Sequence, residues 1–237
     1  MRIIPTLLIK KRALVKTTGF SGEKYLGDPI NALRLFNEYE VHELIILDID
    51  CNEPDYKFLK KLATNSRMPL AYGGGISSLE QALKVIKLGF DKIILNRLLF
   101  KDHQEVERIV NVLGAQSVIG CVEICRNHEG HFGLRVDSRK NLLEFIDFLS
   151  VVGVGEIFFY DTDREGTRKG LETVNFERLC LKIKVPIIFG GGLATYEELA
   201  NIKSTVFDAV AVGSLFVYYG KRNAVLINYD IKKYGLY

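Results

Sequence analysis

The sequence predicts an α/β fold, a (β/α)8 TIM barrel built from two similar half-barrels. Short apolar runs, continuous as in buried parallel strands, alternate with segments of helical spacing along the whole chain. A length of 237 residues suits one such barrel, and no linker or change in composition marks a second domain. A long stretch also repeats at an offset of about 117 residues. We therefore expect one domain over residues 1–237, with half-barrels at approximately 1–115 and 116–237.

The repeat centres on two glycine triplets, Gly73–Gly75 and Gly190–Gly192. Each triplet follows a short apolar run that begins with proline and precedes a segment of helical spacing, as a strand-to-helix corner does. Glycine lets the backbone approach a ligand closely, and the N–H groups of such a corner can face an anion. The other pairs at this offset are Pro69 and Pro186, Ser78 and Thr195, Glu80 and Glu197, Asp91 and Asp208, and Phe100 and Val217. Two anion corners predict an elongated ligand with a negative charge at each end.

The first half is expected to begin with a buried strand and a long polar loop at 10–27, whose length indicates a functional role. Asp28 and Pro29 are a typical N-cap and first helical residue, and Gly89 is expected at a helix C-terminus. The predicted elements in order are strand 3–9, helix 28–39, strand 44–49, helix 55–64, strand 69–72, helix 78–88, strand 92–95 and helix 102–113.

The second half is expected to follow the same plan, with a small hairpin at 127–136 that turns at Glu129-Gly130. The predicted elements are strand 118–124, helix 141–151, strand 156–160, the polar loop 161–167, helix 173–182, strand 186–189, helix 195–202, strand 209–212 and a last helix near 222–229. In such a barrel the active site lies at the C-terminal ends of the strands. Residues at those ends are therefore the candidate site residues.

Composition narrows the class of protein. The net charge of +3 and the absence of a long basic run argue against a nucleic-acid partner. The four cysteines have no convincing metal-ligand spacing and are expected to be reduced, so neither a metal nor a cofactor is predicted. The sequence has no signal peptide and no stretch long enough to span a membrane, which predicts a cytoplasmic location without membrane contact. None of the four histidines falls at a strand end, and none is assigned to catalysis.

Ordered motifs along nearly the whole chain resemble those of the cyclase subunit of imidazole glycerol phosphate synthase. The family is a barrel that takes up ammonia from a separate glutaminase docked on its N-terminal face. The ammonia then reacts with a bisphosphorylated substrate at the C-terminal face. The blocks that carry the resemblance are Arg2–Pro5, Gly27–Pro29, Glu43–Ile49, Gly73–Ile76, Asp91–Lys92, Asn96, Gly155–Ile157, Asp163–Thr167, Gly191–Gly192 and Gly213–Phe216.

The resemblance also implies two catalytic aspartates, at the ends of the first and fifth strands. Here these positions are Leu8, which cannot transfer a proton, and Glu123, which is one methylene longer. Asp48 at the end of the second strand and Glu165, in place of a family aspartate in the sixth loop, are the other candidate catalytic carboxylates. Asp48 can equally be a buried polar group satisfied at a strand end.

The same resemblance assigns an ammonia gate and a partner contact at the opposite end of the barrel. The gate is a ring of Arg2, Glu43, Lys92 and Glu156, each at the start of a strand. Asp91 matches a position that contacts the glutaminase. We therefore expect a heterodimer with a glutaminase subunit.

The substrate positions implied by the resemblance belong to two phosphate sites. Arg97 stands where the family has a small residue, and can be either a phosphate or carboxylate ligand or a surface charge. Asn96 can likewise orient a ligand or satisfy a buried group. The predicted substrate-binding residues are Lys16, Gly75, Asn96, Arg97, Gly166, Thr167, Gly191, Gly192, Gly213 and Ser214.

Retention of the gate and loss of the aspartate at Leu8 resemble a paralogous group of cyclase-like proteins. Those proteins act with a glutaminase-like partner and an amidotransferase to turn an acetamido group of a surface sugar into an acetamidino group. Our leading hypothesis is this role, with ammonia delivered to a phosphorylated substrate or to the third protein. A cyclase of histidine biosynthesis and a non-catalytic ammonia conduit that activates its glutaminase are the alternatives.

Overall fold

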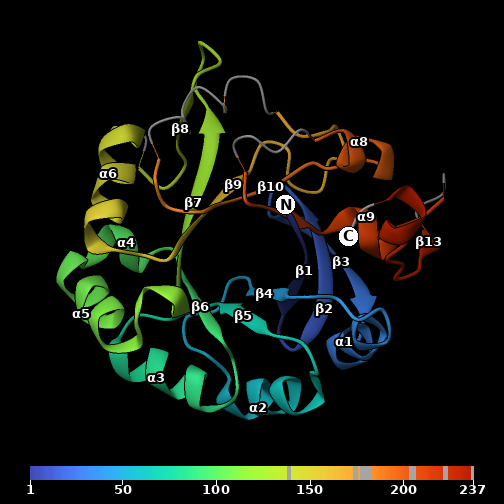
Figure 1. The fold of residues 1–237 in the computed structure, drawn as a ribbon, viewed down its shortest axis with the longest axis horizontal. Coiled ribbons are helices and arrows are strands. Elements are labelled where there is room, and N and C mark those ends of the chain that lie inside the picture. Colours follow the sequence, from blue (N-terminus) through green and yellow to red (C-terminus); the bar gives the residue numbers. More distant parts are fainter. Residues whose placement is uncertain (138–139, 173–175, 177–182, 203–206, 221–223, 236–237) are drawn as a thin grey trace.

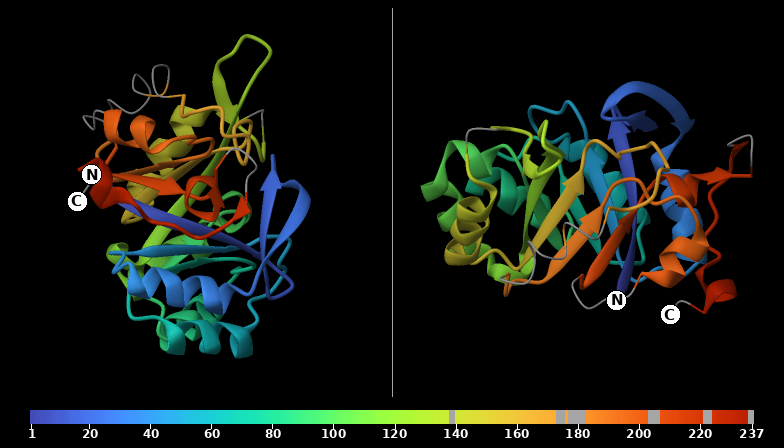
Figure 2. Two further views of the ribbon diagram at one scale, coloured as in Figure 1. Left: turned by 90° about the vertical axis from the view of Figure 1, so that its right-hand side faces the viewer. Right: turned by 90° about the horizontal axis from the view of Figure 1, so that it is seen from above.

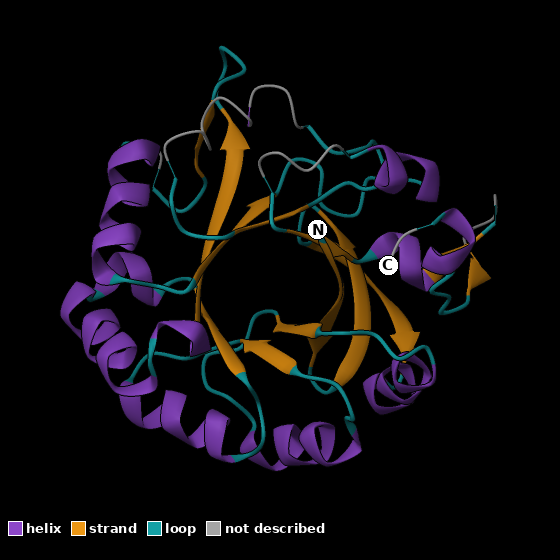
Figure 3. Ribbon diagram, in the orientation of Figure 1, coloured by secondary structure: helices purple, strands orange, loops and turns teal. Residues whose placement is uncertain are grey.

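The computed structural model contains a closed ring of eight parallel strands inside a ring of helices (Figures 1 and 3). The structure describes residues 1–137, 140–172, 176, 183–202, 207–220 and 224–235. β1 pairs in parallel with β11, which closes the barrel. The barrel strands are β1 (Arg2–Lys10), β4 (Leu44–Asp48), β5 (Leu70–Gly73), β6 (Lys92–Leu95), β7 (Val118–Arg126), β9 (Glu156–Asp161), β10 (Ile187–Gly190) and β11 (Ala209–Val212). The predicted TIM barrel is confirmed.

Most of the described helices begin where the sequence offers a side chain that accepts hydrogen bonds from the first turn. The short helices Leu98–Lys101 and Ser214–Val217 have no such cap. Asp28, Asp55, Ser78, Asp102, Asn141 and Thr195 are N-caps of this kind. The helices are α1 (Pro29–Glu38), α2 (Tyr56–Asn65), α3 (Leu79–Lys87), α4 (Leu98–Lys101), α5 (His103–Leu113), α6 (Leu142–Val152), α8 (Tyr196–Asn201) and α9 (Ser214–Val217), with 3-10 turns η1 (Ala115–Ser117) and η2 (Ile231–Tyr234). Apart from Phe176, the helix predicted at 173–182 lies outside the described residues. Across the described chain, no helix is long and apolar enough to cross a membrane.

The barrel strands separate the protein into an inner and an outer layer of side chains. Because successive side chains of a strand point to opposite faces, alternate residues belong to one layer. On β9, Phe158 and Tyr160 belong to the interior cluster, whereas Ile157 and Phe159 belong to the larger cluster under the helices. Glu156 has the same parity as Phe158, so it lies on the inner face at the start of the strand. The inner face of one strand thus connects the two ends of the barrel.

Two hairpins rise from the C-terminal end of the barrel (Figure 2). The segment predicted as a long polar loop at 10–27 is instead an antiparallel hairpin of β2 (Ala13–Thr18) and β3 (Ser21–Gly27). The prediction was wrong because β1 continues to Lys10 and pairs with β2, which buries Leu14 and Val15. The small hairpin predicted at 127–136 is confirmed, since β7 continues to Arg126 and pairs with β8 (Phe132–Leu134).

The predicted last helix near 222–229 is also wrong. β12 (Tyr218–Tyr219) pairs with β13 (Ala224–Val225), and the chain then runs without regular structure to η2. Aromatic and β-branched residues favour strands, and Gly220 has a positive φ of 69° after β12.

Residues at the repeat offset make matching contacts in the two halves. The hydroxyl of Ser78 accepts from Gln81 N, and that of Thr195 accepts from Glu198 N. Asp91 accepts from Leu70 N at 2.9 Å, as Asp208 accepts from Ile187 N at 2.8 Å. These contacts fit two similar halves, although the boundary near residue 115 stays a prediction.

Candidate functional site

The four residues predicted as an ammonia gate form one ring of ion pairs at the N-terminal end of the barrel. Arg2 lies 2.9 Å from Glu43 and also pairs with Glu156. Lys92 closes the ring, with its Nζ atom 2.8 Å from Glu43 and 2.6 Å from Glu156. Because the four side chains come from or beside the starts of β1, β4, β6 and β9, they meet on the axis of the barrel. The ring therefore covers this end of the interior.

Electrostatics hold the ring in its charged form. Burial alone would raise the pKa of Glu156, but hydrogen bonds and charges from Arg2 and Lys92 outweigh it and lower that pKa. Burial likewise opposes the charge of Lys92, yet its two carboxylate partners raise its pKa. Each charged group thus depends on its neighbours in the ring.

A cavity at the C-terminal end brings together many of the predicted substrate residues. Six of them line it, from β2, from the loops that follow β9 and β10, and from the start of α9 after β11. The full lining is Thr6, Lys16, Tyr160, Gly166, Gly191, Gly192, Leu193, Ala211, Gly213 and Ser214. Gly-rich backbone beside a lysine is a combination suited to a phosphate group.

The backbone of this corner requires glycine. Gly191 has a φ of 111°, and a Cβ atom there would lie 2.4 Å from the carbonyl oxygen of Asp161. Gly192 has a φ of 95°, and its Cβ would lie 2.6 Å from the carbonyl oxygen of Gly170. The loops after β9 and β10 therefore pack backbone against backbone around the cavity.

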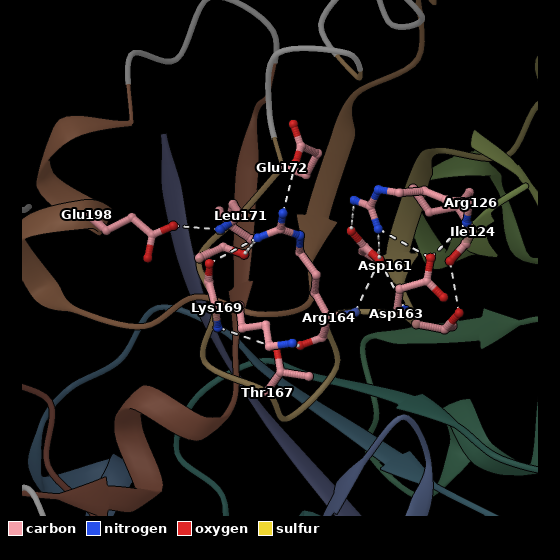
Figure 4. A network of polar contacts seen from close by, with 12 residues as sticks. Ile124, Arg126, Asp161, Asp163, Arg164, Thr167, Lys169, Leu171, Glu172 and Glu198 are labelled. Atoms are coloured by element: carbon pink, nitrogen blue, oxygen red, sulfur yellow. Dashed lines mark hydrogen bonds and ion pairs between the residues drawn. The ribbon is translucent and has the colours of Figure 1, made fainter. Parts of the chain in front are cut away.

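Buried and half-buried charges fix these loops (Figure 4). The guanidinium of Arg164 donates to the carbonyl oxygens of Lys169 and Gly170 at 3.0 Å and to Glu172. Glu198 accepts from the backbone N–H groups of Leu171 and Ala194. The same loop is fixed on its other side by Arg126, which lies 2.8 Å from Asp161. Thr167, a predicted substrate residue, instead donates from its hydroxyl to the Arg164 carbonyl oxygen.

Lys16 and Glu165 form a buried ion pair at the cavity. Their Nζ and Oε1 atoms are 3.3 Å apart. Glu165 also accepts from the Thr17 hydroxyl and from Phe20 N, so it attaches the β2–β3 hairpin to the loop after β9. Burial lowers the pKa of Lys16, and the charge of Glu165 opposes this shift. The predicted catalytic Glu165 thus has structural contacts on both carboxylate oxygens.

Glu123 lies on the inner face of β7, near the end of the strand. Its inward neighbours Ile119 and Cys121 belong to the interior cluster. Burial raises its pKa, and the charges of Arg135 and Arg97 oppose this shift. Arg135 lies 3.6 Å from Glu123. Glu123 can therefore hold a proton at a higher pH than an exposed glutamate.

Leu8 occupies the position where the resemblance implies the other carboxylate. It follows Ile4 and Thr6 on the inner face of β1 and is 2% exposed. Its neighbours across the sheet are Leu47 and Val15, which are apolar. The position of Leu8 thus has no group that can transfer a proton.

The other predicted residues lie on the β4–β6 side of the barrel mouth. Asp48 accepts from the Tyr72 hydroxyl at 3.4 Å, and burial raises the pKa of Asp48 to about 6 against the opposing hydrogen bonds of Cys51 and Tyr72. The Asn96 side-chain amide donates to the carbonyl oxygen of Cys121, and the Arg97 guanidinium donates to that of Cys51.

The first glycine corner differs from the second. A Cβ atom on Gly75 would lie 2.6 Å from Glu53 N, so this corner packs against the loop after β4. Gly75, Asn96, Arg97 and Asp48 are absent from the lining of the cavity at the second corner. The structure therefore groups the predicted substrate residues in two places. Among the described residues, no cluster of three His, Cys, Asp or Glu side chains could hold a metal ion.

Three residues at the barrel mouth were not among the site residues predicted from the sequence. Tyr160 lines the cavity, Phe20 packs edge-on against the Tyr160 ring at 5.2 Å, and Arg135 lies 5.4 Å from the centre of the Phe20 ring. Tyr160 ends a predicted strand and was identifiable from its position. Phe20 and Arg135 lie in hairpins whose tertiary contacts have no sequence signal.

Comparison with known proteins gives one family. Residues 2–223 match the model of the family described as histidine biosynthesis protein. A Pseudomonas aeruginosa protein provisionally named imidazole glycerol phosphate synthase subunit hisF2 is 43% identical over 245 residues, which cover 98% of this chain and 97% of the relative. A Vibrio vulnificus protein provisionally named subunit hisF3 is 36% identical, with 96% and 92% covered. The imidazole glycerol phosphate synthase subunit HisF of Helicobacter hepaticus is 31% identical, with 92% and 90% covered.

Proposed function

Since the chain belongs to the histidine biosynthesis protein family, as a relative of its imidazole glycerol phosphate synthase cyclase subunits, we propose that it is the ammonia-using subunit of a two-subunit glutamine amidotransferase. The observation that carries this proposal is the closed ring of Arg2, Glu43, Lys92 and Glu156 at the end of the barrel opposite the glycine-lined cavity. The partner is a glutaminase bound over the ring, with Asp91 in the contact. The substrate carries a phosphate group.

The interior between the two ends suits a neutral nitrogen nucleophile. Below the mouth the inner layer is mostly apolar, with Ile4, Ile45, Ala71, Ile94 and Ile188 in it. An ion is costly to bury in such a layer, whereas ammonia carries no charge and avoids that cost. The ring would let ammonia pass when the Lys92 pairs separate. Ammonia then reaches the mouth beside Glu123 and Tyr160.

The finer proposal concerns the reaction at the mouth. Leu8 leaves the end of β1 without a carboxylate, so Glu123 is the proposed acid or base for proton transfers to and from the attacking nitrogen. One carboxylate suits addition of ammonia to a carbonyl carbon followed by loss of water. That is the chemistry that turns an acetamido group into an acetamidino group, and a surface sugar is the proposed substrate class. A third amidotransferase protein would supply or activate that sugar.

The second candidate is ring closure to imidazole glycerol phosphate in histidine biosynthesis. The names of the relatives favour it, including the Helicobacter hepaticus subunit. In this case Asp48, whose pKa is raised to about 6 by burial, would act with Glu123. Both candidates require the anion cavity and the ring.

One experiment separates them. Glutamine hydrolysis by the neighbouring glutaminase is measured with and without this chain, together with cyclase turnover of the histidine-pathway intermediate. Cyclase turnover supports the second candidate, whereas stimulated hydrolysis without imidazole glycerol phosphate supports a role outside histidine biosynthesis. An acetamido sugar added as a second substrate then separates amidination, which gives an acetamidino product, from a conduit role, which gives stimulation and no product. The absence of both stimulation and a stable one-to-one complex in analytical ultracentrifugation would overturn the proposed function.

The variant Leu8→Asp adds a further test of the pocket. Cyclase turnover that appears only in this variant means that the remaining cyclase groups are in place. If no turnover appears although the variant folds, the substrate differs from that of the histidine enzyme.

A further inference from the structure

The hydroxyl of Tyr160 is a hydrogen-bond donor that the fold does not use. Tyr160 is 5% exposed, and within the described residues no hydrogen bond of its hydroxyl occurs, although the side chain lines the cavity at the second glycine corner. The hydroxyl is not among the fully enclosed polar atoms that lack a partner, and Tyr160 lines the cavity, so its oxygen is accessible from there. It can therefore donate a hydrogen bond to a ligand in the cavity.

The ring of Tyr160 is held in place from two sides. Phe20 contacts it edge-on at 5.2 Å, and Phe158, two residues earlier on the same inner face, lies 5.2 Å away at 44°. A tyrosine has few rotatable bonds, so packing of this kind fixes the direction of its hydroxyl. The donor is thus positioned before any ligand arrives.

The surroundings of the hydroxyl suit an anion that accepts hydrogen bonds. The cavity contains the ammonium group of Lys16 and the backbone of Gly191, Gly192 and Gly213. Burial, followed by the nearby charge of Glu165, raises the pKa of Tyr160 well above its usual value. The phenol therefore keeps its proton at neutral pH and can donate it to an anionic oxygen.

We propose that Tyr160 is a further phosphate-binding residue, whose hydroxyl donates a hydrogen bond to a phosphoryl oxygen of the substrate at the second glycine corner. The inference rests on the proposed use of that corner for a phosphorylated substrate. Tyr160 pairs in register with Glu123 on the adjacent strand, and both side chains point inward. A phosphate on Tyr160 consequently places the rest of the substrate within reach of Glu123.

The position on β9 also relates this phosphate to the ammonia path. Glu156 and Tyr160 lie on the inner face of one strand, four residues apart, which corresponds to about 13 Å along the strand. The same strand then provides Glu156 to the ring of ion pairs at one end and the Tyr160 hydroxyl to the phosphate site at the other. Tyr160 would bind the phosphate at the point where ammonia leaves the apolar interior.

The test measures binding of inorganic phosphate by calorimetry to the full chain, to Tyr160→Phe and to the control Tyr218→Phe. Tyr218 is a partly exposed tyrosine on β12 whose ring lies 5.6 Å from Lys24 Nζ, and it is outside the cavity lining. We expect Tyr160→Phe to weaken phosphate binding about tenfold, the effect of one hydrogen bond to a charged group. The control should stay within about twofold of the full chain. Both variants should melt within a few degrees of the parent.

A second readout uses the unsubstituted chain labelled with carbon-13 at the tyrosine Cζ atom. The Tyr160 resonance, identified by its loss in Tyr160→Phe or by selective mutation of the other tyrosines, should move as phosphate is added. The resonance of a tyrosine with only a packing role would stay in place when phosphate is added. This arm holds even if Tyr160→Phe fails to fold.

Equal phosphate affinity in Tyr160→Phe, a stationary Tyr160 resonance, or no phosphate binding by the unsubstituted chain would each overturn the inference. Failure of the proposed function can be distinguished from failure of the inference about Tyr160. Phosphate binding that depends on Tyr160, with no glutaminase stimulation and no product, would leave the binding role standing and reject the amidotransferase role.

Discussion

Lys16 and Glu165 are 149 positions apart in the sequence and pair at 3.3 Å inside the barrel mouth. Lys16 comes from β2, and Glu165 from the loop after β9. Both side chains are buried, with exposed fractions of 8% and 0%. The pair therefore joins the first and second halves of the sequence at the cavity where we propose that phosphate binds.

Removing the charge of Glu165 should destabilise the protein. In Glu165→Gln the buried ammonium of Lys16 loses its partner, and breaking such a pair costs about 3 kcal/mol. Urea denaturation at pH 7 measures this loss. Glu23→Gln removes the exposed partner of Lys10 and serves as the control, because exposed pairs contribute little. Equal stability of the two variants would contradict the structural role of Glu165.

Asp48 should make stability depend on pH. Its pKa is about 6 in the folded state because of burial, against an ordinary value of 3.8. Between pH 3.8 and about pH 6 the folded state therefore binds more protons than the unfolded state. The contribution of Asp48 to stability is full below about pH 3.8 and is lost as the pH rises through about 6. In Asp48→Asn the decline between pH 4 and pH 7 should become smaller, with the part due to Glu123 remaining, as measured by urea denaturation at several pH values.

Asp50→Asn is the matched control for this titration. Lys10 lowers the pKa of Asp50, chiefly through a hydrogen bond, so the contribution of Asp50 is present above its unfolded pKa and lost only at lower pH. Substitution of Asp50 should leave the decline between pH 4 and pH 7 unchanged. If both variants behave alike, Asp48 is not the group that titrates.

Gly191→Ala should disrupt the anion corner. Its Cβ would lie 2.4 Å from the Asp161 carbonyl oxygen, and the backbone must move to accept it. We expect a loss of phosphate binding and a destabilisation of more than about 2 kcal/mol, because the steric clash adds to the 1–2 kcal/mol cost of a positive φ in a residue with a side chain. Calorimetry and thermal denaturation check both effects.

Gly130→Ala separates the clash from the φ effect. Gly130 has a φ of 81°, but nothing lies within 4 Å of its Cβ position at the tip of the β7–β8 hairpin. The Gly130→Ala variant should therefore lose only the stability that a positive φ costs a residue with a side chain, and should bind phosphate as the parent does. A similar loss of binding in both variants would mean that the corner is not the site.

Arg135→Met should raise the pKa of Glu123 further. Burial already raises that pKa, and Arg135 is the first of two cations that oppose the shift. Without Arg135 the neutral acid is favoured over a wider pH range. A carbon-13 titration of the glutamate carboxylates measures the change directly. Arg108→Met, which breaks an exposed pair with Glu105 on α5, should leave the Glu123 titration where it was.

The fold was predictable from the sequence because its strands are buried on both faces. Such strands read as continuous apolar runs, as in Leu44–Asp48 and Ala209–Val212, and helix N-caps such as Asp28 and Ser78 mark the boundaries between them. The errors fall where tertiary pairing determines the structure. The β2–β3 hairpin contains polar residues typical of a loop, and the segment after Gly220 contains no residue that excludes a helix.

The candidate site was predictable in part for the same reason. The ring residues and the glycines lie at strand ends, so their neighbours follow from the barrel itself. The roles of Phe20 and Arg135 depend on how two hairpins meet over Glu123, which strand order does not determine. Tyr160 was missed because an aromatic residue at a strand end is ordinarily part of the core.

The segment after β13 has a consequence for the order in which the barrel can assemble. Tyr229 is buried against Phe36 of α1 and Phe216 of α9, so it covers the outside of the seam where β11 meets β1. During synthesis β1 is made first, and its partner β11 is complete only at residue 212. The barrel therefore cannot close until nearly the whole chain has left the ribosome.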